Sequence, residues 1–350
     1  MSRIAILTPY AEPIPGGIST VVLGLQNLLR GHGHETYVLA GAGEGDSPKH
    51  SNLGSDLRYV RRALSALRGL SVDTVHCHAH WYTLVAGIWY RRMRPSTRLV
   101  FSFHTSDVSK WGSIFSWLLS KADVLTFVSA SQLSQLRGNL RLGGDLRILY
   151  PGVIPRVVNI DARREWVARC GLSGSFPVIA FVGPLDYPSK VRGVVDLVGI
   201  VKQLRAIYPT AKLVVVGDGK LRHRISDAAV GAEDAILVTG FVRDPSAALA
   251  TSDIYCHLSY KESFGIAVLE AMSMGSCVVA LRSSGVSEIV DDSALIIVNS
   301  NPQLVADAIR TLAADHVARQ ELGLKARANA LRSHTWEARW PQLASIYGLE

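Results

Sequence analysis

Short apolar segments alternate along the chain with polar turns and with longer segments of helical periodicity. Residues 3–8 form an apolar run that ends at Pro9, residues 18–30 repeat apolar positions at helical spacing, and residues 35–40 form a second apolar run. Short runs bounded by turn residues are typical of buried strands, whereas a period of 3.6 residues is typical of helices. This order of strand, loop, helix and strand predicts the start of a doubly wound parallel α/β sheet.

The alternation continues toward the C-terminus and predicts a second α/β sheet. From the chain length we expect two domains, at 1–155 and 156–333, followed by a helical segment at 334–350. A chain of 350 residues is long enough to give each domain its own core. Further strands are predicted at 72–78, 98–107, 123–129, 146–150, 176–183, 212–217, 236–242, 254–259, 276–281 and 291–298, and further helices at 57–70, 131–137, 220–229, 265–274 and 302–313, with another ending near 207.

The composition indicates a folded globular protein, with 48% hydrophobic and 19% charged residues. No apolar run approaches the roughly 18 residues of a membrane span, and the run at 3–8 is too short for the hydrophobic region of a signal peptide. Cys77, Cys170, Cys256 and Cys277 are scattered without a Cys-x-x-Cys pair, which favours reduced thiols. We therefore expect a cytoplasmic protein.

Basic residues are concentrated in the first half of the chain. Residues 1–155 hold 16 Lys and Arg against 9 Asp and Glu, a charge of +7 out of +8 for the whole chain. Such a surface is either a solvated face or a contact for an anionic membrane or acceptor, so peripheral attachment to the inner membrane face is one hypothesis. Nucleic acid is not expected, because no motif that reads it accompanies the charge. The predicted helix at 57–70 has an apolar face of Leu57, Val60, Leu64 and Leu67 beside Arg58, Arg61, Arg62 and Arg68, and Arg91, Arg92, Arg94 and Arg98 form a second cluster.

The most informative segment is Glu262-Ser-Phe-Gly-Ile-Ala-Val-Leu-Glu270-Ala-Met-Ser-Met-Gly275, which follows the predicted strand at 254–259. Ser263 is a plausible N-cap of a helix that ends at Gly275. The free N–H groups at the start of that helix, over Phe264, Gly265 and Ile266, are suited to bind phosphate. Glu262 precedes the helix and Glu270 lies inside it on another face, so the two carboxylates reach different parts of one ligand.

This segment resembles the Glu-x7-Glu element of the retaining glycosyltransferases of family 4, and Gly285-Val-Ser-Glu288 resembles the segment that usually follows it. The resemblance extends over nearly the whole chain, and Pro151-Gly-Val-Ile-Pro155 stands where the family usually has a short linker. It implies a GT-B fold, in which two Rossmann-like domains face each other, the active site lies in the interdomain cleft and the terminal helix packs back onto the first domain. It also implies transfer of a hexose, from GDP-mannose or a UDP-hexose, to a lipid-linked, polysaccharide or small-molecule acceptor as an α-glycoside.

The resemblance also implies roles for individual residues. Glu262 would orient the donor sugar, and Glu270 would hold the ribose. His104, at the end of the strand at 98–107, would lie beside the donor sugar. The leaving phosphate itself would take the acceptor proton, so no side-chain base is assigned. The glycine pair Gly16 and Gly17 would contact the donor phosphate, and the segment Gly240, Phe241 and Val242 would contact the base.

One turn departs from the family pattern. After the strand at 176–183, Pro184 stands where the family usually has Arg, and Arg192 stands where it usually has Lys. Lys190 and Arg192 are therefore the expected diphosphate ligands, because an arginine keeps its charge and can bind phosphate through two N–H groups.

Three histidines at a period of two, His76, His78 and His80, are a possible metal cluster if the strand at 72–78 continues. No carboxylate or cysteine accompanies them at ligand spacing, and a His-x-His-like strand end is common in the resembled family. The chain also contains no Asp-x-Asp. We expect neither a metal nor a cofactor, with the leaving diphosphate neutralised by the helix dipole and the two cations.

Other functions stay open. The loss of the usual arginine at Pro184 is compatible with a GT-B protein that binds nucleotide sugars without transferring them. The basic first half alone would suit a peripheral membrane or polyanion-binding module, and a sugar phosphorylase is a further alternative. A dinucleotide-dependent dehydrogenase is not expected, because the first turn lacks Gly-x-Gly-x-x-Gly.

Overall fold

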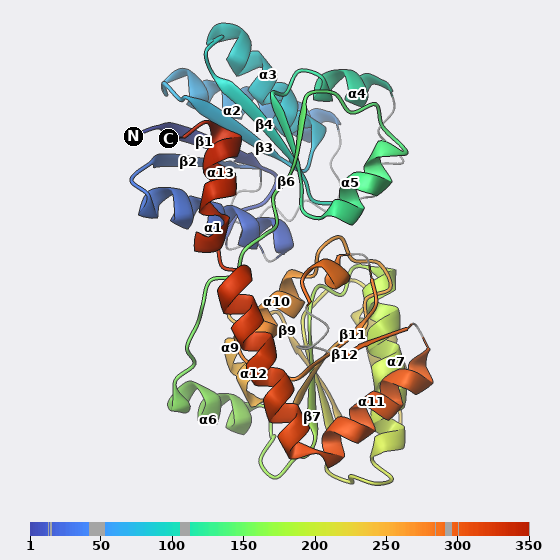
Figure 1. The fold of residues 1–350 in the computed structure, drawn as a ribbon. Coiled ribbons are helices and arrows are strands. Elements are labelled where there is room, and N and C mark those ends of the chain that lie inside the picture. The colour runs from blue at the N-terminus through green and yellow to red at the C-terminus, as the bar shows by residue number, and fades with distance from the viewer. Residues whose placement is uncertain are drawn as a thin grey trace. The chain divides into compact units, whose positions relative to one another are not determined.

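The computed structural model describes residues 1–12, 14, 16–41, 53–105, 113–283, 285–290, 296–299 and 301–349, and the statements below concern these residues. Parts of the predicted loops at 9–17 and 41–56, the end of the strand predicted at 98–107 and the start of that predicted at 291–298 lie outside them. The chain divides into two compact units, which are described separately. The first unit comprises residues 1–152 and 336–350, and the second comprises residues 153–335 (Figure 1).

The first unit is built on a parallel sheet with the strand order β2-β1-β3-β4-β5-β6. The strand order reverses at β1, so the connections that leave β1 and β3 diverge. The strands are β1 Arg3–Thr8, β2 Glu35–Ala40, β3 Thr74–His78, β4 Arg98–Phe103, β5 Val124–Phe127 and β6 Asp145–Ile148. The helices are α1 Gly17–Gly31, α2 Leu53–Arg68, α3 Trp81–Met93, α4 Ser113–Leu119, α5 Ala130–Arg137, η2 Glu337–Arg339 and α13 Trp340–Tyr347.

The second unit has a parallel sheet in the order β12-β11-β10-β7-β8-β9, which reverses between β7 and β10. Its strands are β7 Val178–Val182, β8 Lys212–Val216, β9 Ile236–Gly240, β10 Ile254–His257, β11 Val278–Leu281 and β12 Ile296–Val298. Its helices are α6 Ile160–Arg169, α7 Pro188–Leu204, α8 Arg222–Ala229, α9 Ser246–Thr251, α10 Ile266–Ser273, η1 Val286–Glu288, α11 Pro302–Ala314 and α12 His316–Ser333.

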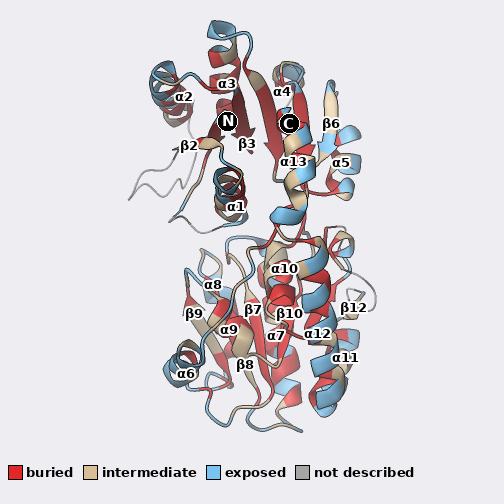
Figure 2. Ribbon diagram, turned by 60° about the vertical axis from the view of Figure 1, so that its left-hand side comes forward, coloured by how far each residue is buried: buried red, intermediate tan, exposed pale blue. Residues whose placement is uncertain are grey.

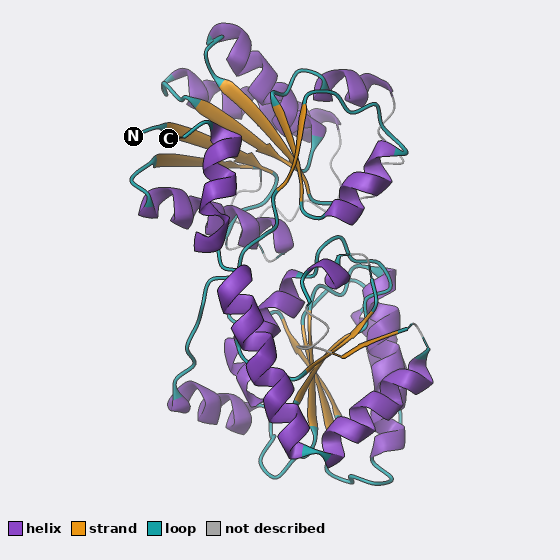
Figure 3. Cartoon of the chain, in the orientation of Figure 1, coloured by secondary structure: helices purple, strands orange, loops and turns teal. Residues whose placement is uncertain are grey.

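The predicted class, two doubly wound parallel α/β sheets, is confirmed (Figure 3). Each described sheet lies between helices on both of its faces, so the strands read as nearly continuous apolar runs. The colouring by burial shows this, with the strands largely buried and the outer helix faces exposed (Figure 2). The sequence analysis did not predict the helices α3, α4, α6, α9 or α12.

The buried face of α2 differs from the predicted one. Leu57 is half exposed, whereas Tyr59 and Leu67 are buried against the sheet together with Val60. The hydroxyl of Tyr59 donates a hydrogen bond to the carbonyl oxygen of Leu39 at 3.0 Å, which fixes the aromatic ring against β2. The predicted apolar face was therefore wrong at its first position, because the face that packs on the sheet is centred on Tyr59, Val60 and Leu67, and Leu57 lies outside it.

The residues after 335 pack on α1. Trp336 is buried, and a Cβ atom added at Gly24 would lie 1.9 Å from its indole nitrogen. The Trp340 ring stacks on His32 with centroids 3.6 Å apart, and His32 also contacts the carboxylate of Glu337 at 2.8 Å. The glycine in α1 is thus required by the close approach of Trp336.

We expect Gly24→Ala to lower the free energy of unfolding by about 1–3 kcal/mol, because the methyl group would overlap the Trp336 ring. The matched control is Gly199→Ala in α7, where an added Cβ meets no atom within 4 Å. That change should raise stability by about 0.5–1 kcal/mol, because alanine favours the helix and restricts the unfolded chain. Thermal unfolding of both variants measures the difference, and a Gly24→Ala protein as stable as the control would contradict the packing.

Candidate active site

A candidate site lies where the strand order of the second sheet reverses. The carboxyl ends of the adjacent strands β7 and β10 lead in different directions, and such switch points are where open α/β sheets bind ligands. Lys190 comes from α7 after β7, and Glu262 from the loop after β10. A Cβ at Gly193 would lie 1.6 Å from the carbonyl oxygen of Leu258, so glycine lets α7 pack directly against the end of β10.

The Glu262 carboxylate is held by two donors on one of its oxygens. Lys190 Nζ lies 2.9 Å from Oε2, and His257 Nε2 lies 3.1 Å from the same atom. Only 13% of the Glu262 side chain is exposed. Burial raises its pKa, but the His257 hydrogen bond and the charge of Lys190 outweigh burial and set the pKa at about 2. Glu262 is therefore ionised at neutral pH.

His257 and Tyr255 were not recognised from the sequence. They alternate along β10 and so point to the same face, with the Tyr255 hydroxyl 3.1 Å from His257 Nδ1. Both side chains are buried. Burial lowers the pKa of His257 despite the neighbouring Glu262. The available signal was a pair of polar aromatic residues at a period of two within a buried strand.

The loop after β10 enters α10 through Gly265, which corrects the prediction of Ser263 as N-cap. Gly265 is the N-cap residue, with a left-handed φ of 100°, and no side chain caps the helix. A side chain is strained at this φ, whereas glycine is not. A Cβ at Gly285 would lie 2.5 Å from Phe264 N, so the segment at 285–288 supports this loop directly. Because the cap offers no side-chain acceptor, the N–H groups of Ile266 and Ala267 stay available to an anion, whereas Val268 N already donates to the carbonyl oxygen of Gly265 at 2.9 Å.

Glu270 lies in α10 in the opposite electrostatic situation to Glu262. Glu270 is partly buried, and burial raises the pKa of its carboxyl group to about 7. The positive charge of Arg156 opposes this rise, whereas the negative charge of Asp244 adds to it. Arg156 and Asp244 form an ion pair with atoms 2.6 Å apart. The sequence analysis did not single out this pair, since the two residues are far apart along the chain.

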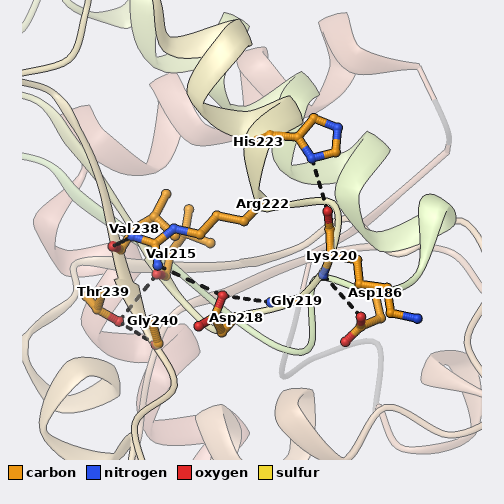
Figure 4. Close-up of polar contacts among 10 residues, drawn as sticks. All are labelled: Asp186, Val215, Asp218, Gly219, Lys220, Arg222, His223, Val238, Thr239 and Gly240. Carbon is orange, nitrogen blue, oxygen red and sulfur yellow. Dashed lines mark hydrogen bonds and ion pairs between the residues drawn. The ribbon is translucent and has the colours of Figure 1, made fainter. Parts of the chain in front are cut away.

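The segment Gly240, Phe241 and Val242 begins at the last residue of β9, the edge strand of the same sheet, and Figure 4 shows the contacts around Gly240. The carbonyl oxygen of Gly240 accepts a hydrogen bond from Gly217 N at 3.0 Å, and Arg222 donates to the carbonyl oxygen of Val238 at 3.0 Å. The Phe241 side chain is half exposed. All strands of the sheet are parallel, so this segment lies at the same carboxyl edge as Glu262 but two strands beyond β7.

Arg192 is not brought together with Lys190. The two residues are two positions apart on α7, so their side chains leave the helix in different directions. Arg192 lies over the ring of Tyr260 at 4.2 Å from its centroid, and the Tyr260 hydroxyl donates to Asp196 at 2.6 Å. Pro184 lies at the end of β7, where the Lys190 side chain passes close to Gly183.

In the first unit, Gly16 is the N-cap of α1 and Gly17 its first residue, with no side-chain cap. His104 follows β4 and lies 2.9 Å from the imidazole of His78, measured between His104 Nε2 and His78 Nδ1. Burial and the charge of His80 lower the pKa of His104 to about 4, so its ring is neutral at pH 7. These residues belong to the carboxyl edge of the first sheet.

The three histidines of the possible metal cluster do not share one strand face. β3 ends at His78, Ala79 turns the chain with a φ of 66°, and His80 is the N-cap of α3. His76 Nε2 lies 2.6 Å from Ser102 Oγ, and its Nδ1 lies 2.5 Å from the Tyr347 hydroxyl. Within the described residues, no group of three or more His, Cys, Asp or Glu side chains is placed to hold a metal ion.

Two family profiles match the chain. The family profile described as Glycosyltransferase Family 4 matches residues 15–156, and that described as Glycosyl transferases group 1 matches residues 176–315. The phosphatidyl-myo-inositol mannosyltransferase of Mycobacterium leprae is 25% identical over 370 residues, covering 99% of this chain and 96% of that protein. The N-acetyl-alpha-D-glucosaminyl L-malate synthase of Bacillus anthracis is 24% identical over 304 residues, covering 83% and 78%.

Solved structures of glycosyltransferases share the fold. Sucrose-phosphate synthase from Thermosynechococcus elongatus superposes with a TM-score of 0.81 at 18% identity, covering 99% of this chain and 98% of that one. HepE from Anabaena, in complex with UDP-glucose, gives a TM-score of 0.79 at 18% identity, covering 99% and 100%. At this identity the likeness shows the fold, which is GT-B. No helix among the described residues has both the length and the apolar character needed to cross a membrane.

Glu270 should make stability depend on pH. Its pKa is about 7 in the folded protein against an ordinary value of 4.5, so its contribution to stability is full below pH 4.5 and is lost as the pH rises through 7. Glu270→Gln stays neutral and should be more stable than the wild type at pH 8 by about 1–2 kcal/mol, reduced by partial exposure. At pH 4.5 the two proteins should unfold alike.

Thermal unfolding at pH 4.5 and pH 8 measures this difference. Glu165→Gln, an exposed position on α6, is the control for the removal of one charge. A Glu270→Gln protein that is less stable than the wild type at pH 8 would contradict the raised pKa.

Proposed function

Because the chain belongs to the family 4 glycosyltransferases, we propose that it moves a hexose from a nucleoside-diphosphate sugar to an acceptor with retention, forming an α-glycoside. The observation that supports this most is the buried, ionised Glu262 between Lys190 and His257, next to the uncapped N-terminus of α10. A carboxylate can accept hydrogen bonds from sugar hydroxyls, while a helix N-terminus and a lysine favour a diphosphate. The two kinds of group lie side by side at the switch point.

Different residues of the second unit would bind the diphosphate, the ribose and the base of the donor. We assign the diphosphate to the N–H groups from Phe264 to Ile266 and to Lys190, and the ribose to Glu270. The half-exposed Phe241 and its neighbours would meet the base. Arg192 is the less favoured diphosphate ligand of the two cations, because it stacks on Tyr260 instead of facing Glu262.

The chemistry follows from this placement of charge. Departure of the nucleoside diphosphate builds negative charge, which the dipole of α10 and Lys190 would stabilise in place of a metal ion. The leaving phosphate would take the proton of the acceptor hydroxyl as the new bond to the anomeric carbon forms. In the first unit, Gly16 and Gly17 are assigned to the donor phosphate and His104 to the sugar, as the family resemblance implies.

The donor proposed is GDP-mannose or a UDP-hexose. Several of the similar proteins are named as phosphatidyl-myo-inositol mannosyltransferases, and a structure with the same fold is a complex with UDP-glucose. A thermal-shift panel of UDP-, GDP- and ADP-sugars would identify the base, because a ligand that binds the folded state raises the apparent stability. The rival reading, a protein that binds nucleotide sugars without transferring them, predicts a thermal shift but no released diphosphate.

The two glutamates should fail in different ways. At pH 8, above its pKa of about 7, Glu270 is mostly ionised, so at that pH Glu270→Gln removes a charged partner of the ribose, and the affinity for the free nucleoside diphosphate should fall about ten- to a hundredfold. Glu262→Gln should leave that affinity unchanged and lower mainly the turnover, since Glu262 faces the transferred sugar. Isothermal titration with the diphosphate and a rate assay with the full donor, both in EDTA, separate the two effects.

Glu165→Gln is again the control, with wild-type affinity and rate expected. Equal and negligible effects of both active-site changes would show that the spacing of the two glutamates is a coincidence. A rate that EDTA abolishes and Mn²⁺ restores would contradict the proposal that no metal takes part.

The acceptor side is proposed to include an anionic lipid surface. Arg58, Arg61 and Arg62 are exposed on α2, which packs beside α3. Trp89 on α3 and Trp117 on α4 are both about half exposed, at 52% and 53%. Arg92 and Lys121 lie over these two rings, at 5.7 and 5.1 Å from their centroids. Exposed tryptophans beside cations are typical of surfaces that bind the interface of a bilayer.

We expect replacement of Arg58, Arg61 and Arg62 by Ser to weaken binding to anionic vesicles, because each basic residue contributes on the order of 1 kcal/mol at modest salt. The control replaces Arg163, Arg164 and Arg169 of α6 by Ser, which removes the same charge from the second unit. Co-sedimentation at low and high salt measures both. Wild-type protein that fails to bind at low salt would identify the arginines as a solvated face.

A further inference from the structure

We propose that His257 is a positioning residue, which holds Glu262 so that one carboxylate oxygen is presented to the donor sugar, and that Tyr255 fixes the imidazole in the required tautomer. The inference rests on the proposed function, because it gives Glu262 a partner in that reaction. Neither His257 nor Tyr255 belongs to the two motif segments that carry the resemblance, Glu262–Gly275 and Gly285–Glu288.

Both donors to Glu262 converge on the same atom. Lys190 Nζ and His257 Nε2 contact Oε2, at 2.9 and 3.1 Å, and no described residue makes a hydrogen bond with Oε1. The two donors come from different elements, α7 and β10, so together they restrict rotation of the carboxylate. Oε1 is thereby left as an acceptor for a hydroxyl of the ligand.

The protonation states determine which way each hydrogen bond runs. Glu262 is ionised at neutral pH and can only accept, so His257 must donate from Nε2. Burial keeps the ring of His257 neutral, and its Nδ1 then carries no proton. Nδ1 therefore accepts from the Tyr255 hydroxyl, 3.1 Å away. This chain of donors, from Tyr255 through His257 to Glu262, selects the Nε2–H tautomer.

Lys190 by itself would supply charge but not direction. An ammonium group rotates freely and is also assigned to the diphosphate, so a carboxylate paired with it alone can turn about its axis. The imidazole of His257 is restrained more strongly, because it is buried and its ring lies nearly parallel to that of Phe181, with an angle of 12° between them. The rigid donor is thus the one that sets the orientation of Glu262.

Four variants test this role. His257→Leu removes the N–H group, and His257→Gln places an amide N–H at about the same distance from the backbone. Tyr255→Phe removes the hydroxyl that selects the tautomer. Cys256→Ala, buried on the opposite face of β10, is the matched control for a change in the strand.

We expect His257→Leu to lower kcat about ten- to a hundredfold, because a hydrogen bond to a charged group is lost. Its affinity for the free nucleoside diphosphate should stay at the wild-type value. His257→Gln should recover most of the rate, and Tyr255→Phe should lose less than His257→Leu. Cys256→Ala should lose stability but no rate. Equal losses in the Leu and Gln variants, or an affinity that falls together with the rate, would overturn the positioning role.

A second measurement does not depend on activity. In protein labelled with ¹⁵N-histidine, the signal that His257→Gln removes should be that of a neutral Nε2–H imidazole at pH 7. In Tyr255→Phe a part of that signal should shift toward the other tautomer, because Glu262 alone then favours Nε2–H. An Nδ1–H or a cationic ring in the wild type would overturn the inference, whatever the enzyme does. A wild-type protein that turns over no nucleotide sugar would contradict the proposed function instead, while the imidazole signal still decides whether the hydrogen bond exists.

Discussion

A buried carboxylate that must keep its charge sets the arrangement at the switch point of the second unit. Glu262 is largely withdrawn from water, and an unpaired charge there would be strongly destabilising. Lys190 and His257 satisfy it only if α7 and β10 come within hydrogen-bonding distance of one loop. Gly193 makes this approach possible, since a side chain at that position would overlap the carbonyl oxygen of Leu258. The packing of α7, β10 and the loop that carries Glu262 is therefore linked through one atom, Glu262 Oε2.

Glu262 and Glu270 show how one segment gives two carboxylates different chemistry. The first is ionised because its partners outweigh burial, whereas the second titrates near neutrality because burial outweighs the field of Arg156. A group with such a raised pKa lowers the stability of the folded protein at neutral pH. Residues that a structure tolerates at such a cost are often functional, which fits the assignment of Glu270 to a ligand.

The sequence was a good guide wherever a feature depends on neighbours along the chain. The alternation of apolar runs and helical segments predicted both parallel sheets, and the Glu262–Gly275 segment marked the family. Local reasoning failed where a neighbour from elsewhere decides the geometry. Ser263 is not the N-cap, because the support of the loop by Gly285 favours the left-handed turn at Gly265. Leu57 is not buried, because the side of α2 that meets the sheet is centred on Tyr59, whose hydroxyl donates to Leu39 in β2.

By itself the sequence determined the fold class and the two acidic positions. Both can be read from residues that are close together along the chain, through the hydrophobic periodicity and the Glu262–Gly275 motif. Only the tertiary structure decided what surrounds Glu262. Lys190 is 72 positions away along the chain, and its pairing with Glu262 follows from the adjacency of β7 and β10 in the sheet. His257 and Tyr255 read as part of an apolar strand until the neighbouring loop places Glu262 above them. The ionisation of Glu262 depends on its burial and on its distances to Lys190 and His257, and both are set by the tertiary fold.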